Sequence, residues 1–236
     1  MTNIHVENSI SDMKALFYFC VVTFIYALSA GLFIQLYAIP VLFPHFNFGD
    51  GLAIMDSVGF DKIAREKAIE ISREGWRAWE LRPQLQSPAG IASFFYTHWT
   101  PKPYSLLPFN AIVHALSGCL IVWLLRHFYS LLPAIVGGAV FVLNPAAMEW
   151  VAQIHRDGVF ILGNLMVLAC LFQLSKSLYY FKASSVMWGL FFGLSGTIVV
   201  WVARGFWIQV LFSSILLWVG LLVLLCAYID ISVDED

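Results

Sequence analysis

Long apolar runs constrain this chain more than any other feature, because about 20 mostly apolar residues form a helix that crosses the hydrocarbon core of a bilayer. One run reads ILGNLMVLACLFQL and follows directly after the polar stretch QIHRDGVF. Hydrophobic residues make up 60% of the 236 residues and charged residues only 12%, which excludes a soluble domain. Alternating strands of barrel length are not visible, so we expect an all-α polytopic membrane protein.

Six transmembrane helices are expected from these runs, at residues 15–43, 104–126, 130–148, 157–175, 184–203 and 206–229. We expect them to form a single membrane domain over residues 1–236, with the first span retained because it is too long for a signal-peptide core. The third run is interrupted by glycine and proline and barely reaches the required length. The four cysteines lie inside apolar runs without metal-ligand spacing, so they predict neither a disulfide nor a zinc site.

The largest polar region, residues 44–103, separates the first two spans and sets the expected orientation. Four basic residues lie at the ends of spans on the side of the membrane that holds both chain termini, namely Lys14, Arg126, Lys176 and Lys182. Arg156 and Arg204 flank the other side, together with the long loop. Because cytoplasmic loops carry the excess of Lys and Arg, we expect an extracytoplasmic loop and two cytoplasmic termini in a cell inner or plasma membrane.

Within this loop, the stretch from Asp56 to Trp79 has the periodicity of an amphipathic helix. Its apolar face consists of Phe60, Ile63, Ala64, Ala68, Ile71 and Ala78. Such a helix lies either in the membrane interface or in water with its apolar face packed on the rest of the protein. Both interpretations remain open.

Charged residues from distant parts of the sequence are expected at the same outer level. Asp50 follows the first span, Arg156 and Asp157 precede the fourth, and Arg204 separates the fifth from the sixth. Two carboxylates and two guanidinium groups at one membrane surface are typical of a polar site. The alternative is that they are interfacial anchors, with Asp157 favoured by the dipole of the helix that it begins.

A polar stripe on the second span descends from the same level toward the middle of the membrane. Asn110, His114 and Ser117 follow one another at i, i+4 and i+7, so they share one helix face. They line either an outward-opening cleft or a seam of hydrogen bonds between helices.

The layout resembles the N-terminal half of the GT-C superfamily, the membrane glycosyltransferases that use polyprenyl-phosphate-linked sugars. The resemblance rests on a first span followed by FNFGD, an amphipathic loop helix, a proline-rich return into YSLLPFNAIVHALSG, and a short outer loop reading NPAAMEWVAQIHRDGVF. It covers most of residues 15–175. The chain departs from the familiar pattern in having fewer spans and in having Asp50 where many members have an acidic pair.

The resemblance implies a role for each candidate residue. Asp50 would be the general base at the acceptor, and Asp157 a helper carboxylate or metal ligand. Substrate-binding residues would be His155, Arg156, Arg204, Asn110 and His114, with the two arginines at the lipid phosphate. This chemistry is reasonable because a carboxylate can take the proton of an attacking hydroxyl and guanidinium groups stabilise a departing phosphate.

The leading hypothesis is therefore glycosyl transfer at the extracytoplasmic face, from a polyprenyl-phosphate-linked sugar to a lipid or glycan acceptor. Membrane lipids are the other expected partners. No glycine-rich nucleotide loop or HExxH motif is present, which favours a lipid-linked donor. A divalent metal is a possible cofactor, and a net charge of −2 gives no basis for a nucleic-acid partner. The rival hypothesis is a non-enzymatic protein of an envelope polysaccharide pathway that binds or flips a lipid phosphate, or scaffolds a complex.

Overall fold

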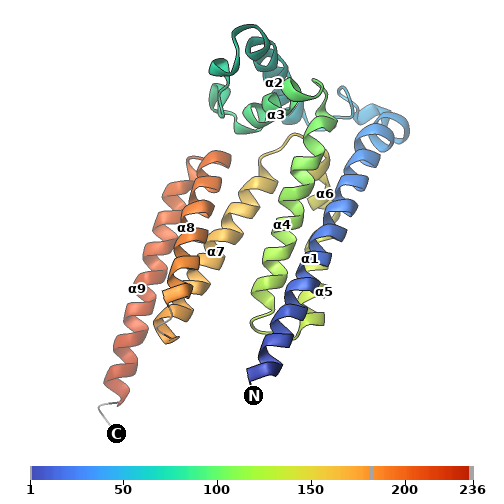
Figure 1. The fold of residues 1–236 in the computed structure, drawn as a ribbon. Helices are drawn as coiled ribbons and strands as arrows, with labels where there is room; N and C mark the ends of the chain where they lie inside the picture. The colour runs from blue at the N-terminus through green and yellow to red at the C-terminus, as the bar shows by residue number, and fades with distance from the viewer. Residues whose placement is uncertain (1, 181–182, 234–236) are drawn as a thin grey trace.

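The computed structural model describes residues 2–180 and 183–233, and all regular secondary structure among these residues is helical. Lys182, which contributed to the expected orientation, lies outside them. The long helices stand side by side, and the helices of the first loop lie across one end of them (Figure 1). The start of the first helix and the end of the last helix lie at the opposite end (Figure 1).

Four stretches are long and apolar enough to cross a membrane: Asp12–Leu42, Pro103–Leu125, Asp157–Ser177 and Ala183–Ala203. They belong to α1 (Thr2–Phe33) with the π-helix η1 (Ile34–Leu42), η5 (Pro103–Leu106) with α4 (Leu107–Leu125), α7 (Asp157–Tyr180), and α8 (Ala183–Ala203). The last helix, α9, covers Trp207–Val233, and the part of it that the structure describes in full includes the apolar stretch Trp207–Leu221. The all-helical class is confirmed for the described residues, and the apolar helices indicate a membrane protein, whereas the count of six spans stays a prediction.

The predicted span 130–148 is not one straight helix. It consists of α5 (Leu131–Val142) and α6 (Pro145–Ala152), which meet at 58°, and the two together would make a fifth span. The bend has a local cause, because Pro145 cannot donate a backbone hydrogen bond and restricts the residue before it. Asn144 then caps α6, since its side-chain oxygen accepts a hydrogen bond of 3.0 Å from the Ala146 backbone nitrogen.

The residues between η1 and α4, which we name the loop layer, contain two helices joined by short turns. These are α2 (Met55–Glu74) and α3 (Ser87–His98), with the 3-10 turns η2 (Pro44–Phe46), η3 (Trp76–Ala78) and η4 (Pro83–Leu85). Phe60, Ala64 and Ala68 of α2 are buried in one cluster with residues of α3. The apolar face of α2 therefore packs on protein, and the placement of this helix in a membrane interface stays a prediction.

Among the long helices, α4 packs against α1 and α5 on one side and against α7 on the other. The pair α7 and α8 is in close contact because glycines face each other across it. A Cβ added at Gly196 would lie 2.8 Å from the carbonyl oxygen of Gly163. Small residues of this kind let membrane helices approach closely, which is the main source of packing energy in lipid.

The loop layer is attached to the membrane helices through residues 151–154, which are the last two residues of α6 and the first two of its connection to α7. Asn110 of α4 donates from Nδ2 to the carbonyl oxygens of Val151 and Gln153, both at 3.0 Å. Gln35 of η1 donates to the carbonyl of Ala152 at 2.9 Å, and the hydroxyl of Ser57 in α2 donates to the carbonyl of Ile154 at 3.0 Å. Three elements thus satisfy the carbonyl groups of one buried segment.

We expect replacement of Asn110 by Leu to lower the free energy of unfolding by about 1–3 kcal/mol, because two buried carbonyl groups lose their donor. The matched control is Asn164→Leu, since the Asn164 side chain donates only to Phe160 of its own helix, at 2.8 Å. Denaturation in detergent micelles, followed by tryptophan fluorescence, measures both variants. Equal stability of the two variants would contradict this role of Asn110.

Candidate functional site

Asp50 lies in a turn whose backbone is strained. It has φ of +49°, and it stands between Gly49 at +139° and Gly51 at +79°. The side-chain oxygen of Asn47 accepts hydrogen bonds from the backbone nitrogens of both glycines, at 3.2 and 3.1 Å. A non-glycine residue at positive φ costs free energy and persists only where its surroundings enforce it, which is frequent at functional sites.

Gly51 shows how tightly this turn is enclosed. A Cβ atom at this position would lie 1.9 Å from the backbone oxygen of Gln35. Gln153 fixes the turn from the other side, since its Nε2 donates to the Gly51 carbonyl at 3.1 Å and its Oε1 accepts from the Ala53 nitrogen at 2.9 Å. The turn that carries Asp50 is therefore bound directly to the 151–154 segment.

The carboxylate of Asp50 forms ion pairs with two cations. Lys102 Nζ lies 2.7 Å from one oxygen, and Arg65 Nη2 lies 2.8 Å from the other. The hydrogen bond from Lys102 outweighs partial burial and lowers the pKa of Asp50, so the carboxylate is ionised at neutral pH. The Asp50 side chain is 37% exposed, which leaves it accessible to a ligand.

A cavity of about 320 Å³ opens beside this carboxylate. It is lined by Asp50, Lys102, Gln35, Asn47 and Tyr104, among others. The Oε1 atom of Gln35 is buried and has no hydrogen-bond partner among the described residues. A buried acceptor of this kind costs free energy.

Arg65 is held in place by a second carboxylate. Its Nε donates to Asp61 at 2.7 Å, and the Tyr96 hydroxyl donates to the other oxygen of Asp61 at 2.5 Å. Burial and the Asp61 carboxylate raise the pKa of Tyr96 well above its usual value, so this hydroxyl keeps its proton. The i,i+4 spacing of Asp61 and Arg65 was a weak indication of this pair, whereas no sequence pattern pointed to Lys102.

Asp157 belongs to a different set of ion pairs. Arg204 Nη2 donates to one of its oxygens, and His155 Nδ1 lies 3.2 Å from the other. Asp157 is the first residue of α7, where the helix dipole favours a carboxylate. The structure thus brings together three predicted site residues, His155, Asp157 and Arg204. Asp157 is not among the described residues that line the cavity of Asp50.

A third arginine, Arg82 of the loop layer, joins this region. Its guanidinium lies over the ring of Trp201 at 5.2 Å, and a Cβ added at Gly205 would lie 3.0 Å from its Nη1. Arg156 directly precedes Asp157, the partner of Arg204, and lines a separate small cavity with Ala203. We name Arg82, Arg156 and Arg204 the arginine cluster. Sequence spacing could not identify Arg82, because only the fold brings residues of η4 to the turn between α8 and α9.

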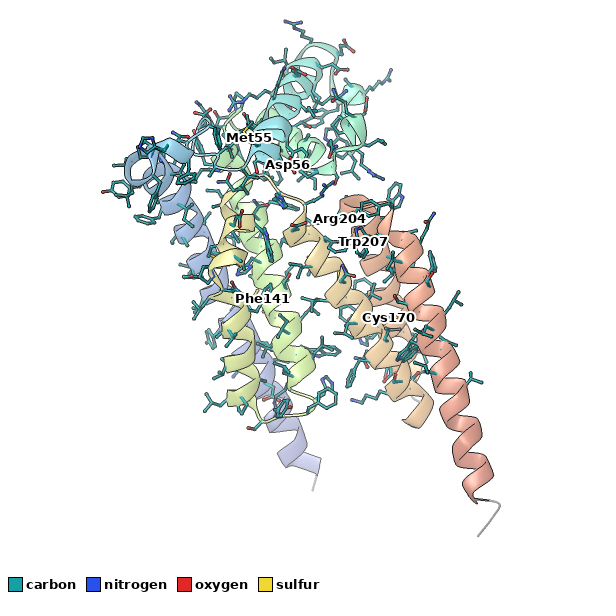
Figure 2. The ribbon with its side chains drawn as sticks, turned by 180° about the vertical axis from the view of Figure 1, so that it is seen from behind. Met55, Asp56, Phe141, Cys170, Arg204 and Trp207 are labelled. Carbon is teal, nitrogen blue, oxygen red and sulfur yellow. The ribbon has the colours of Figure 1, made fainter. Side chains whose placement is uncertain are left out.

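Several polar atoms around the arginine cluster are buried without a partner among the described residues. They are Arg82 Nε, Arg204 Nε, Trp207 Nε1 and Gln86 Oε1. Arg204 and Trp207 lie where the turn between α8 and α9 meets the loop layer (Figure 2). Buried polar groups normally find partners, so these unpaired groups set this region apart among the described residues.

Asn110 and His114 have structural partners. Asn110 bonds the 151–154 segment, and His114 Nε2 lies 3.1 Å from the Val142 carbonyl oxygen. With His155 they line a cavity of only about 10 Å³, the space of one water molecule. This geometry matches the interhelical seam, the alternative interpretation of the stripe. Substrate contact by Asn110 and His114 stays a prediction.

Among the described residues, no group of three or more His, Cys, Asp or Glu side chains could hold a metal ion. Comparisons with protein-family models, curated proteins and solved structures found no match for this chain.

We expect Gly51→Ala to lower the free energy of unfolding by about 2–4 kcal/mol, because the new Cβ meets a backbone oxygen and the residue keeps a positive φ. The control is Gly59→Ala in α2, where the added Cβ meets no atom within 4 Å. That change should be neutral or stabilise by about 0.5–1 kcal/mol, since alanine favours a helix. Thermal unfolding in detergent tests both. A neutral Gly51→Ala variant would show that the turn relaxes freely.

Proposed function

We propose that this chain is a membrane glycosyltransferase that moves a sugar from a polyprenyl-phosphate-linked donor to an acceptor hydroxyl at the extracytoplasmic face. One observation carries the proposal. A strained and accessible carboxylate, Asp50, and the arginine cluster are attached to the same 151–154 segment at one end of the membrane helices, since Gln153 bonds the Asp50 turn and Arg156 follows soon after.

The arginine cluster binds the donor phosphate in this proposal. Arg82 and Arg204 carry buried Nε groups without partners, and Asp157 offsets only part of the positive charge. Guanidinium groups bind phosphate through paired hydrogen bonds that are stronger than neutral ones. Asp157 then acts on Arg204, which it holds in position before the phosphate arrives. This role differs from that of a helper carboxylate or metal ligand.

Asp50 receives the acceptor in the cavity of about 320 Å³. Its carboxylate takes the proton of the acceptor hydroxyl as that oxygen bonds to the anomeric carbon. The bond between the anomeric carbon and the phosphate oxygen breaks, and polyprenyl phosphate leaves with the negative charge.

The second candidate is a protein that binds a lipid phosphate without transferring a sugar. The observation in its favour is the pairing of Asp50 with Lys102 and Arg65, which lowers the pKa of Asp50 and makes it a weaker base. In the enzyme, the acceptor hydroxyl must displace Lys102 before proton transfer. The two candidates share the arginine cluster and differ in what Asp50 does.

We expect Asp50→Asn to lower the rate of sugar transfer by about 10²–10⁴-fold, because the amide keeps the size of the side chain but cannot take the proton. The assay is transfer of a radiolabelled hexose from its polyprenyl phosphate by the full chain in liposomes. The matched control is Glu149→Gln, since Glu149 is an exposed carboxylate of α6 outside the site. If the wild-type protein transfers the sugar and Asp50→Asn transfers it at the same rate, Asp50 is excluded as the base.

We expect Arg82→Ala to weaken binding of polyprenyl phosphate about 10- to 100-fold, since charge-assisted hydrogen bonds are lost, and Arg82→Lys to weaken it less. Arg77→Ala is the control, because Arg77 is an exposed arginine of the same loop layer. Isothermal titration in detergent measures the affinity. Binding that is unaffected by Arg82→Ala and Arg204→Ala would exclude the phosphate site. Loss of binding without any detectable transfer by wild-type protein would favour the non-enzymatic candidate.

A further inference from the structure

A second cavity lies among the membrane helices, away from the loop layer. It has a volume of about 450 Å³, and it lies between α1, α4, α7 and α8. This volume falls in the range of about 300–1,000 Å³ that is typical of ligand sites. Its lining is almost wholly apolar and includes Leu120, Trp123, Leu162, Met166, Gln173 and Trp188.

The shape of this cavity matches one leaflet of a bilayer. On α7 the lining extends from Leu162 to Gln173, which at 1.5 Å per residue is a length of about 16 Å. The hydrocarbon core is about 30 Å thick, so the cavity extends over roughly half of it. Trp123 near the end of α4 and Trp188 near the start of α8 place one end of the cavity on the side away from the loop layer, and Leu162 of α7 places its other end nearer the loop layer.

Basic residues lie near the ends of α4 and α7 that are far from the loop layer, where the cavity approaches these ends. The ring of His127 lies 4.6 Å from that of Phe172, and Lys176 follows Phe172 by one turn of α7. Arg126 is adjacent and pairs with Asp12 at 2.9 Å. Burial lowers the pKa of His127, and the charges of Lys176 and Arg126 lower it further. Together with Asp12, these groups leave a net positive charge at the mouth of the cavity.

We propose that this cavity holds one acyl chain of an anionic glycerophospholipid from the leaflet opposite the loop layer, with the lipid phosphate at Lys176 and Arg126. The leaflet-long apolar lining selects a hydrocarbon chain, and the net positive charge selects an anionic headgroup. Lipid tails are as apolar as the lining, so the specificity comes from the headgroup. The bound chain fills the space between α4 and the pair α7 and α8. This site does not depend on the proposed transferase activity.

Native mass spectrometry of the full chain tests the proposal. The protein is equilibrated with dioleoyl phosphatidylglycerol or dioleoyl phosphatidylcholine, and the lipid that is retained after graded removal of detergent is counted. We expect one phosphatidylglycerol per chain to be retained in preference to phosphatidylcholine. Lys176→Gln should lower that preference about fivefold, since one basic residue near the headgroup is removed.

A matched pair of leucine substitutions tests the cavity itself. Leu120→Trp places an indole in the cavity and should abolish retention of both lipids. Leu168→Trp is the control, because Leu168 lies on α7 outside the cavity and is 51% exposed, so retention should equal that of the wild type. Equal retention by Leu120→Trp and Leu168→Trp, or no effect of Lys176→Gln on the preference, would overturn the proposal. So would a wild-type dimer that Leu120→Trp converts to a monomer, because the cavity would then bind a second copy of the chain.

Discussion

The arrangement of this protein depends on how the carbonyl groups of residues 151–154 are hydrogen-bonded. The last carbonyl groups of α6 and those of the connection after it have no partners within the helix, and at the edge of a membrane each unpaired polar group costs free energy. Asn110, Gln35 and Ser57 supply donors from α4, η1 and α2. Because these donors come from distant parts of the sequence, satisfying one segment also fixes the position of the loop layer on the membrane helices.

The same segment positions both halves of the candidate site. The side-chain amide of Gln153 forms hydrogen bonds with the turn that carries Asp50. Another rotamer of Gln153 would leave these polar groups unpaired, so this side chain enforces the strained backbone at Asp50. At the other end of the segment the chain enters α7, where Asp157 is held by the helix start and by Arg204. Rigid attachment of this kind is what a transfer reaction requires, because misplacement by about 1 Å can cost a factor of 100 in rate.

The sequence predicted the helical class of the described residues, because apolar runs of membrane length leave few other structures open. It also predicted that Asp157 and Arg204 share one level, and they form an ion pair. It could not predict the bend of the third run in detail, since the angle of 58° depends on packing around Asn144 and Pro145. Nor could it identify Lys102 and Arg82, which reach the site only through the fold of the loop layer. The polar stripe of Asn110 and His114 was recognised, but spacing alone cannot distinguish a cleft from a hydrogen-bonded seam.

The two carboxylates differ in a way that separates their roles. Asp157 is paired with Arg204 and lies beside His155, with side chains that are about one quarter exposed or less. Asp50 is more exposed, borders a cavity of about 320 Å³, and has a backbone conformation that few residues other than glycine tolerate. A group that only anchors a helix has no need of strain or of a cavity, and Asp157 has neither of these features among the described residues. Asp50 has both, so of the two it is the one whose surroundings suit contact with a reacting molecule, while Asp157 is suited to holding the arginine that meets the phosphate.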